Sequence, residues 1–151
     1  MSAQILIVDD SPFLRSSIRS SIEHNTDWQV CGEAENGQVA IEKTRELHPD
    51  LIILDLAMPI MNGLDAARHI ASFDPGVDIV LFTMHDSREL SKYAELIGIK
   101  QVLSKSSGGI DQLLSTVRVL LAIRSIDHCH RRSPSDLQDD PDGRTESPAI
   151  S

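Results

Sequence analysis

Side chains that could bind a metal ion or transfer a phosphoryl group stand at the ends of apolar runs in this sequence. They are Asp9 and Asp10 after residues 4–8, Asp55 after residues 51–54, Thr83 at the end of residues 77–83, and Lys105 at the end of residues 100–105. Carboxylates held together repel each other, which raises a pKa or requires a cation, and Mg²⁺ prefers such oxygen ligands. A lysine ammonium beside them suits a phosphoryl or carboxylate anion. Taken singly, Asp55 could instead cap the following turn, because Pro59 and Asn62-Gly63 direct the chain away from a strand.

Apolar runs alternate with amphipathic segments along the first 124 residues, which predicts the elements that would position these side chains. The expected strands cover residues 4–8, 28–33, 51–54, 77–83 and 100–105, and the expected helices begin near residues 12, 37, 64, 87 and 109. We expect the first helix to carry Phe13, Leu14, Ile18 and Ile22 inward and the last to end at about Arg124. This alternation is typical of an α/β protein with a doubly wound parallel sheet of five strands and five helices. The carboxyl ends of parallel strands share one edge, so the candidate side chains should converge there.

Composition limits the class of protein. The chain has 151 residues, 40% of them hydrophobic, and a formal net charge of -9. This predicts one domain with a normal core and disfavours direct nucleic-acid binding. No apolar run approaches the ~20 residues that cross a membrane, and the start lacks a basic targeting segment. We therefore expect no membrane contact. Cys31 and Cys129 lie far apart and do not indicate a disulfide framework, so we expect the protein in the reducing cytoplasm.

The composition changes after Ile126. Residues 127–151 contain three prolines, many serines and aspartates, and few large apolar side chains. Such a segment cannot bury enough surface to offset the entropy of ordering it. We therefore expect a domain over residues 1–126 and a disordered acidic and polar tail over residues 127–151. His128-Cys129-His130 is interpreted as an incidental cluster, because three consecutive residues cannot surround one metal ion well.

Four short motifs together resemble the receiver domain of two-component response regulators. They are Val8-Asp9-Asp10-Ser11, Leu54-Asp55-Leu56-Ala57-Met58-Pro59 with Met61-Asn62-Gly63-Leu64, Phe82-Thr83-Met84-His85, and Leu103-Ser104-Lys105. The resemblance covers roughly residues 4–124. It implies a flavodoxin-like sheet with strand order 2-1-3-4-5, and a sensor histidine kinase or phosphotransfer protein as the partner.

The resemblance also implies a role for each candidate residue. Asp55 would be the phosphoacceptor. Asp9 and Asp10 would hold Mg²⁺, or Mn²⁺, together with Asp55 and the backbone carbonyl of Ala57. Thr83 would receive a phosphoryl oxygen, and Lys105 would pair with the aspartyl phosphate. Ala57 and His85 would line the path of water to the phosphate, and together with Met84 they would tune the lifetime of the phosphorylated state.

The sequence departs from the receiver pattern in two places. Many receivers carry an aromatic switch residue three positions before the lysine, where this chain has Val102. Many also have proline directly after the lysine, whereas Lys105 is followed by Ser106-Ser107-Gly108-Gly109. The second feature resembles the branch of receivers that precede a LuxR-type helix-turn-helix domain, and no such domain follows in this sequence.

Three other functional classes remain open from the sequence. One is a transcriptional regulator without its DNA-binding domain, and another is a binding module that works without phosphorylation. The third is an aspartate-nucleophile phosphatase of the haloacid dehalogenase type. That class usually has a second aspartate two residues after the nucleophile, where this chain has Ala57, so the phosphatase hypothesis is disfavoured.

The last predicted helix has apolar residues on two sides. Val119, Ile123 and Ile126 lie opposite the stripe that should face the core. We hypothesise a homodimer through the first and last helices. A docking site for an output domain, or scattered exposed aliphatic residues, would explain the same pattern.

Overall fold

Residues 2–106 and 108–138 are described by a computed structural model, with side chains as far as residue 126. The chain divides into two units, Met1–Val117 and Arg118–Ser151. The first unit contains the complete sheet and all of the candidate site residues.

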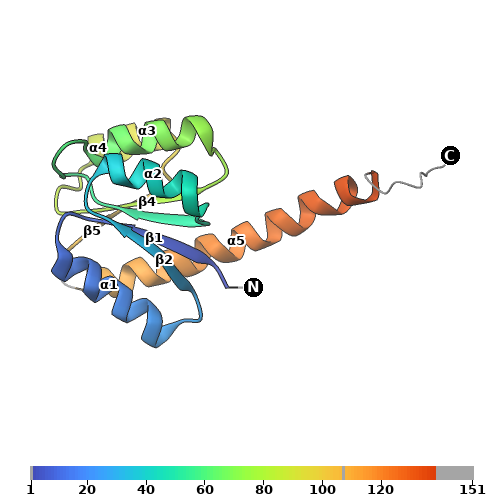
Figure 1. The fold of residues 1–151 in the computed structure, drawn as a ribbon, viewed down its shortest axis with the longest axis horizontal. Helices are drawn as coiled ribbons and strands as arrows, with labels where there is room; N and C mark the ends of the chain where they lie inside the picture. The colour runs from blue at the N-terminus through green and yellow to red at the C-terminus, as the bar shows by residue number, and fades with distance from the viewer. Residues whose placement is uncertain (1, 107, 139–151) are drawn as a thin grey trace. The chain divides into compact units, whose positions relative to one another are not determined.

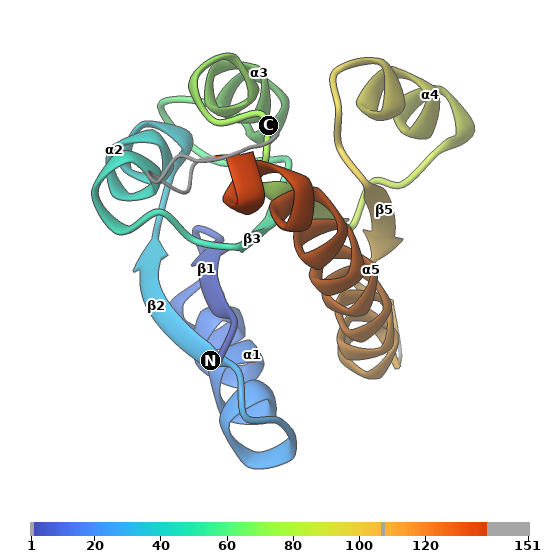
Figure 2. The ribbon, with the colours of Figure 1, turned by 90° about the vertical axis from the view of Figure 1, so that its right-hand side faces the viewer.

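Five parallel strands form one sheet in the order β2-β1-β3-β4-β5. The strands are β1 (Gln4–Val8), β2 (Gln29–Ala34), β3 (Leu51–Leu54), β4 (Asp78–Thr83) and β5 (Gln101–Ser104). The helices are α1 (Pro12–Asn25), α2 (Gly37–Leu47), α3 (Gly63–Phe73), α4 (Arg88–Leu96) and α5 (Gly109–Gln138). Helices α2, α3 and α4 lie on one face of the sheet, and α1 with the start of α5 lies on the other (Figures 1 and 2). The predicted fold class and strand order are therefore confirmed.

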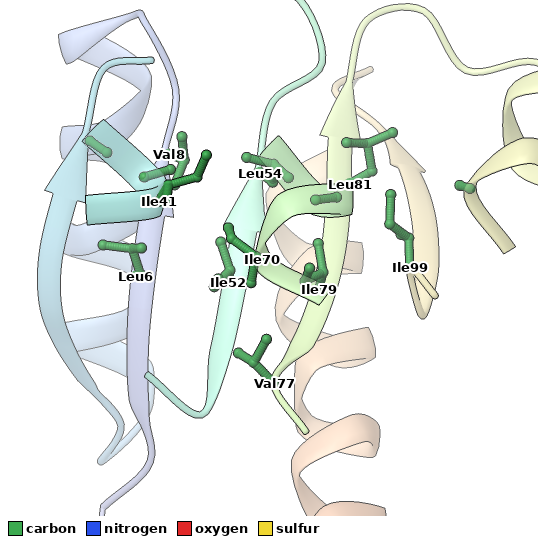
Figure 3. Close-up of a cluster of buried hydrophobic side chains, with 14 residues drawn as sticks. Leu6, Val8, Ile41, Ile52, Leu54, Ile70, Val77, Ile79, Leu81 and Ile99 are labelled. Carbon is green, nitrogen blue, oxygen red and sulfur yellow. The ribbon is translucent and has the colours of Figure 1, made fainter. Parts of the chain in front are cut away.

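The central strands are buried on both faces because helices cover both sides of the sheet. All four residues of β3 and all six of β4 are buried, which explains why residues 51–54 and 79–82 are unbroken apolar runs. Alternate residues of β1, β3 and β4 pack against α2 and α3. Figure 3 shows this cluster, which includes Leu6, Val8, Ile52, Leu54, Ile79 and Leu81 from the strands with Ile41 and Ile70 from the helices.

A polar side chain caps the start of each of the helices α1, α2, α3 and α4. Ser11 accepts a hydrogen bond from the Leu14 N–H at 3.2 Å, and Pro12 occupies the first turn of α1. Asn36, Asn62 and Ser87 cap α2, α3 and α4 in the same way. Each cap satisfies backbone donors that a helix start leaves without partners. The connections before α1, α2 and α4 are short, whereas residues 55–62 form a longer loop between β3 and α3.

Two local expectations were wrong. Phe13 is 81% exposed, whereas Ile18 and Ile22 of the same helix are buried as expected. Phe13 lies five residues before Ile18, about 140° around the helix from the side that Ile18 and Ile22 bury, so it faces away from the core. Helix α5 continues to Gln138 instead of ending near Arg124. No glycine or proline occurs between residues 110 and 133, and a change to polar composition does not by itself end a helix.

The helical range of α5 includes residues that composition assigned to the tail, and residues 139–151 lie outside the described part of the chain. The division at residue 126 therefore stays a prediction. None of the helices in the described residues has the length and apolar composition that crossing a membrane requires.

Candidate functional site

Asp55 follows the last residue of β3 and is held at the carboxyl edge of the sheet. Its backbone N–H donates to the Val8 carbonyl at 2.9 Å, and its side chain is buried, with 6% of the residue exposed. Its Oδ1 atom accepts hydrogen bonds from the Leu56 N–H at 2.8 Å and from Lys105 Nζ at 3.2 Å. Within the described part of the chain, no group donates to Oδ2. One carboxylate oxygen is thus anchored, and the other can react.

Lys105 connects the ends of β1 and β3 from the far side of β4. Its Nζ lies 2.6 Å from Asp9 Oδ2 and 3.2 Å from Asp55 Oδ1. The lysine side chain is only 12% exposed, so these contacts are weakly screened by water. Its backbone N–H donates to the Thr83 carbonyl at 2.9 Å. The convergence of Asp9, Asp55 and Lys105 that parallel strands predicted is present.

Three carboxylates crowd this edge. One carboxylate oxygen from each of Asp9, Asp10 and Asp55 lies within 4.8 Å of the corresponding oxygens of the other two residues. Burial raises the pKa of Asp55, and the neighbouring Asp9 carboxylate raises it further, although Lys105 and the Leu56 N–H oppose the shift. Asp9 and Asp55 are buried, whereas Asp10 is exposed to solvent. Hard oxygen donors that carry excess negative charge and open to solvent on one side fit a divalent cation such as Mg²⁺.

Thr83 ends β4 and is completely buried. Its Oγ1 accepts a hydrogen bond from the His85 N–H at 3.1 Å, which leaves the hydroxyl proton to be donated elsewhere. The structure places Thr83 on the strand next to β3, at the same edge as Asp55, but it gives no direct contact between the two side chains. Met84 and His85 follow as exposed residues.

The loop from Asp55 to α3 turns back onto the strand end. The Gly63 N–H donates to the Leu56 carbonyl at 2.8 Å. A Cβ atom at Gly63 would lie 2.1 Å from the Asp55 carbonyl oxygen, so no other residue fits this approach without moving the chain. Ala57 lies in this loop as an exposed residue two positions after Asp55. Its carbonyl as a metal ligand stays a prediction.

The loop is also attached to the start of α2. The Gly37 N–H donates to the Met61 carbonyl at 3.1 Å, and a Cβ atom at Gly37 would lie 2.7 Å from that carbonyl oxygen. The β2–α2 and β3–α3 connections are therefore packed against each other beside the phosphoacceptor candidate.

An ion-pair network that the sequence patterns did not predict lies beside Asp9. Arg15 on α1 contacts both the Asp9 carbonyl and the Glu33 carboxylate on β2, and Arg19 contacts the same glutamate. The spacing of Arg15 and Arg19 places them on one side of α1, which could have suggested a shared acidic partner. The partner itself depends on how β2 pairs with β1, and composition does not reveal that.

The residues proposed for a dimer contact have the exposure that such a contact needs. Val119 is 57% exposed, Ile123 51% and Ile126 67%. All three residues belong to the unit that begins at Arg118. Dimerisation stays a prediction.

Comparisons with known proteins agree with this geometry. The family model described as the response regulator receiver domain matches residues 5–118. The chemotaxis protein CheY of Halobacterium salinarum is 37% identical over 105 residues, which are 70% of this chain and 86% of that protein. A protein-glutamate methylesterase/protein-glutamine glutaminase of Methanosarcina mazei is 39% identical over 136 residues, which cover 88% of this chain. This chain spans only 37% of the length of that methylesterase.

A solved structure has the same fold as this chain, and its sequence identity to this chain is similar to that of the two relatives above. A two-component response regulator of the LuxR family from an Aurantimonas species has a TM-score of 0.76 and 32% sequence identity, and the match covers 81% of this chain and 86% of that chain. The resemblance that the four motifs indicated is confirmed by the family match and by these relatives. The chain belongs to the response regulator receiver domain family.

Proposed function

We propose that this receiver is a phosphorylation switch in which Asp55 accepts a phosphoryl group from a phosphohistidine of a sensor histidine kinase or phosphotransfer protein. The observation that carries the proposal is the environment of Asp55. Its carboxylate is buried, one oxygen is anchored by Lys105 and the Leu56 N–H, and two further carboxylates lie beside it. An aspartate that only capped a turn would need none of these neighbours.

The transfer uses the two oxygens of Asp55 differently. With Oδ1 anchored, Oδ2 attacks phosphorus, and the O–P bond forms while the N–P bond of the phosphohistidine breaks. The electron pair of the broken bond goes to the imidazole nitrogen. When bound by Asp9, Asp10, Asp55 and the Ala57 carbonyl, Mg²⁺ or Mn²⁺ would offset the negative charge on the phosphoryl oxygens. Lys105, already 3.2 Å from Asp55, would pair with one of those oxygens.

Phosphorylation would be sensed at the end of β4. The product places a phosphoryl group at the edge where Thr83 ends its strand, and the Thr83 hydroxyl would donate to a phosphoryl oxygen. Because Thr83 Oγ1 also accepts from the His85 N–H, a change at Thr83 would be transmitted to the Met84-His85 segment before α4. Val102 is half-buried and would not supply an aromatic flip, so the signal would pass through this segment.

The output would be protein contact, in the cytoplasm, without an enzymatic activity beyond the formation and hydrolysis of the Asp55 phosphate. A second candidate is a receiver that controls a methylesterase. The match to the Methanosarcina mazei methylesterase covers 88% of this chain, so it extends past residue 118, where the receiver match ends. This similarity beyond residue 118 supports the idea that the segment after the receiver, and not the receiver alone, resembles that of the methylesterase.

Residues that flank the site should set how long the phosphate survives. Ala57 and His85 are exposed at the mouth of the site, as is Met84. Ala57→Asn adds an amide that can orient an attacking water, so we expect faster loss of phosphate, and His85→Ala should also change the rate. Decay can be followed by the intact mass of the phosphorylated protein after the donor is removed. Decay at the wild-type rate in both variants would contradict this role.

The proposed function is tested by incubating the protein with Mg²⁺ and a small acyl phosphate or phosphoramidate donor and measuring its intact mass. We expect the wild-type protein to gain one phosphate, and we expect no gain in Asp55→Ala or in the presence of a chelator. Absence of any gain in the wild-type protein would favour a binding module that works without phosphorylation.

A further inference from the structure

Both backbone polar groups of Asp9, the N–H and the carbonyl, form hydrogen bonds. Its N–H donates to the Ala34 carbonyl of β2 at 3.0 Å, and its carbonyl accepts from Arg15 Nη1 at 2.5 Å. The side chain accepts from the Ser11 N–H at 2.9 Å and from Lys105 Nζ at 2.6 Å. Every polar group of Asp9 thus has a partner, and Arg15 is the partner that fixes its carbonyl.

Asp10 is in the opposite situation. It is exposed, and among the side-chain contacts of the described residues none reaches its carboxylate. The direction in which Asp10 projects therefore depends on the peptide plane that joins it to Asp9. That plane contains the carbonyl to which Arg15 donates. Arg15 therefore contacts the peptide from which one proposed cation ligand projects, but it does not contact that ligand itself.

Arg15 is itself fixed by Glu33 on β2. Arg15 Nε lies 2.9 Å from Glu33 Oε1, and Arg19 Nε lies 2.7 Å from Glu33 Oε2. Burial opposes ionisation of Glu33, but the hydrogen bonds from Arg19 and Arg15 outweigh it and lower the pKa of this carboxyl. Glu33 is therefore a stable anion that holds the guanidinium of Arg15, whose side chain is only 17% exposed.

We propose that Arg15, held by Glu33, is a positioning residue for divalent-cation binding by Asp9 and Asp10. This inference rests on the proposed function, since it assumes that the three carboxylates hold a cation. Arg15 acts by orienting the Asp9–Asp10 peptide, in the way that groups behind a metal ligand orient the ligand. Geometry and not charge is the cause, because the positive charge of Arg15 would by itself oppose the binding of a cation nearby.

Arg19 provides a matched control. It lies on the same helix, binds the same glutamate, and carries the same charge, but it contacts Glu23 at 3.3 Å in place of the Asp9 carbonyl. A general effect of removing an arginine from this network should be shared by Arg15→Met and Arg19→Met. An effect on the Asp9–Asp10 peptide should be confined to Arg15.

The test measures Mg²⁺ binding to the unphosphorylated protein by calorimetric titration, with thermal unfolding of each variant in a chelator. We expect Arg15→Met to weaken Mg²⁺ binding about 10-fold, and Arg19→Met to bind within about 2-fold of the wild-type protein. Arg15→Lys should remain weakened, because an ammonium keeps the charge but cannot bridge Glu33 and the Asp9 carbonyl in the same way. Glu33→Gln should weaken binding more than Glu23→Gln, which removes the same charge but does not release Arg15, and this pair provides the test if Arg15→Met does not fold.

Equal Mg²⁺ affinity in Arg15→Met and the wild-type protein would overturn the inference, as would an equal loss in Arg15→Met and Arg19→Met. Full rescue by Arg15→Lys would show that the bridge from the guanidinium to both Glu33 and the Asp9 carbonyl is not needed, which would also overturn the inference. A wild-type protein that binds no Mg²⁺ but gains phosphate would instead remove the cation from the proposed function, and this inference with it.

Discussion

Asp55→Asn is expected to abolish phosphorylation and, in a magnesium-free buffer at neutral pH, to make the protein more stable than the wild-type chain by about 1 kcal/mol. The phosphoacceptor is lost because an amide oxygen cannot form the acyl phosphate. The gain in stability follows from the raised pKa of Asp55, caused by burial and by the Asp9 carboxylate. The amide keeps an oxygen that can accept from Lys105 and the Leu56 N–H, so the variant removes a charge without removing these contacts.

The dependence on pH has a definite sign. Below the ordinary pKa of an aspartate, Asp55 is protonated in both the folded and unfolded states, so the variant and the wild-type protein should be equally stable. As the pH rises through the raised pKa of folded Asp55, the wild-type protein loses stability and the variant does not. Chemical denaturation from acid to neutral pH measures this difference.

The exposed Asp27 provides the control for that measurement. It also carries one carboxylate, but it lies in the turn before β2, at the opposite edge of the sheet from the acidic cluster. Asp27→Asn should change stability by less than about 0.5 kcal/mol. If Asp55→Asn were no more stable than the wild-type protein at neutral pH, the crowding of carboxylates would not be a source of instability.

Gly63→Ala is expected to destabilise the fold by about 3 kcal/mol and to prevent phosphorylation in the fraction that remains folded. The new Cβ atom would lie 2.1 Å from the Asp55 carbonyl oxygen and 3.1 Å from Leu56 Cα. These neighbours are backbone atoms that cannot rotate aside, so the α3 start or the end of β3 must shift. A shift at the end of β3 moves the Asp55 carboxylate relative to Lys105, and a shift of α3 breaks the hydrogen bond from the Gly63 N–H that holds this loop.

Gly76→Ala is the matched control for this substitution. At Gly76 the nearest atom to a new Cβ is Asp74 Oδ1 at 3.9 Å, so stability should change by less than about 0.5 kcal/mol and phosphorylation should persist. Thermal unfolding and intact mass after donor treatment measure both effects. Normal phosphorylation of Gly63→Ala would show that the close approach is not needed to place Asp55.

Much of the site follows from sequence because parallel strands share an edge. Each apolar run ends in a polar residue, and the strand order then brings Asp9, Asp55 and Lys105 into contact. The fold class follows from the same alternation, since unbroken apolar runs between amphipathic segments leave few other arrangements.

What could not be predicted depends on contacts between elements. The pairing of Arg15 with Glu33 requires both the rotation of α1 and the pairing of β2 with β1, neither of which hydrophobic periodicity reveals. The exposure of Phe13, by contrast, follows from its spacing, because it lies about 140° around α1 from the buried Ile18. The need for glycine at position 63 arises from a backbone approach and not from the turn alone, so a turn signal could not identify it.

The most direct test of the central claim identifies the residue that is phosphorylated. After treatment with Mg²⁺ and a small phosphodonor, borohydride reduces an aspartyl phosphate to homoserine with release of phosphate, and peptide mass spectrometry locates the converted residue. We predict homoserine at position 55 alone, only in samples that received both donor and Mg²⁺. Homoserine at Asp9 or Asp10, or an unmodified peptide around residue 55 in a protein that has gained phosphate, would contradict the assignment of Asp55 as the phosphoacceptor.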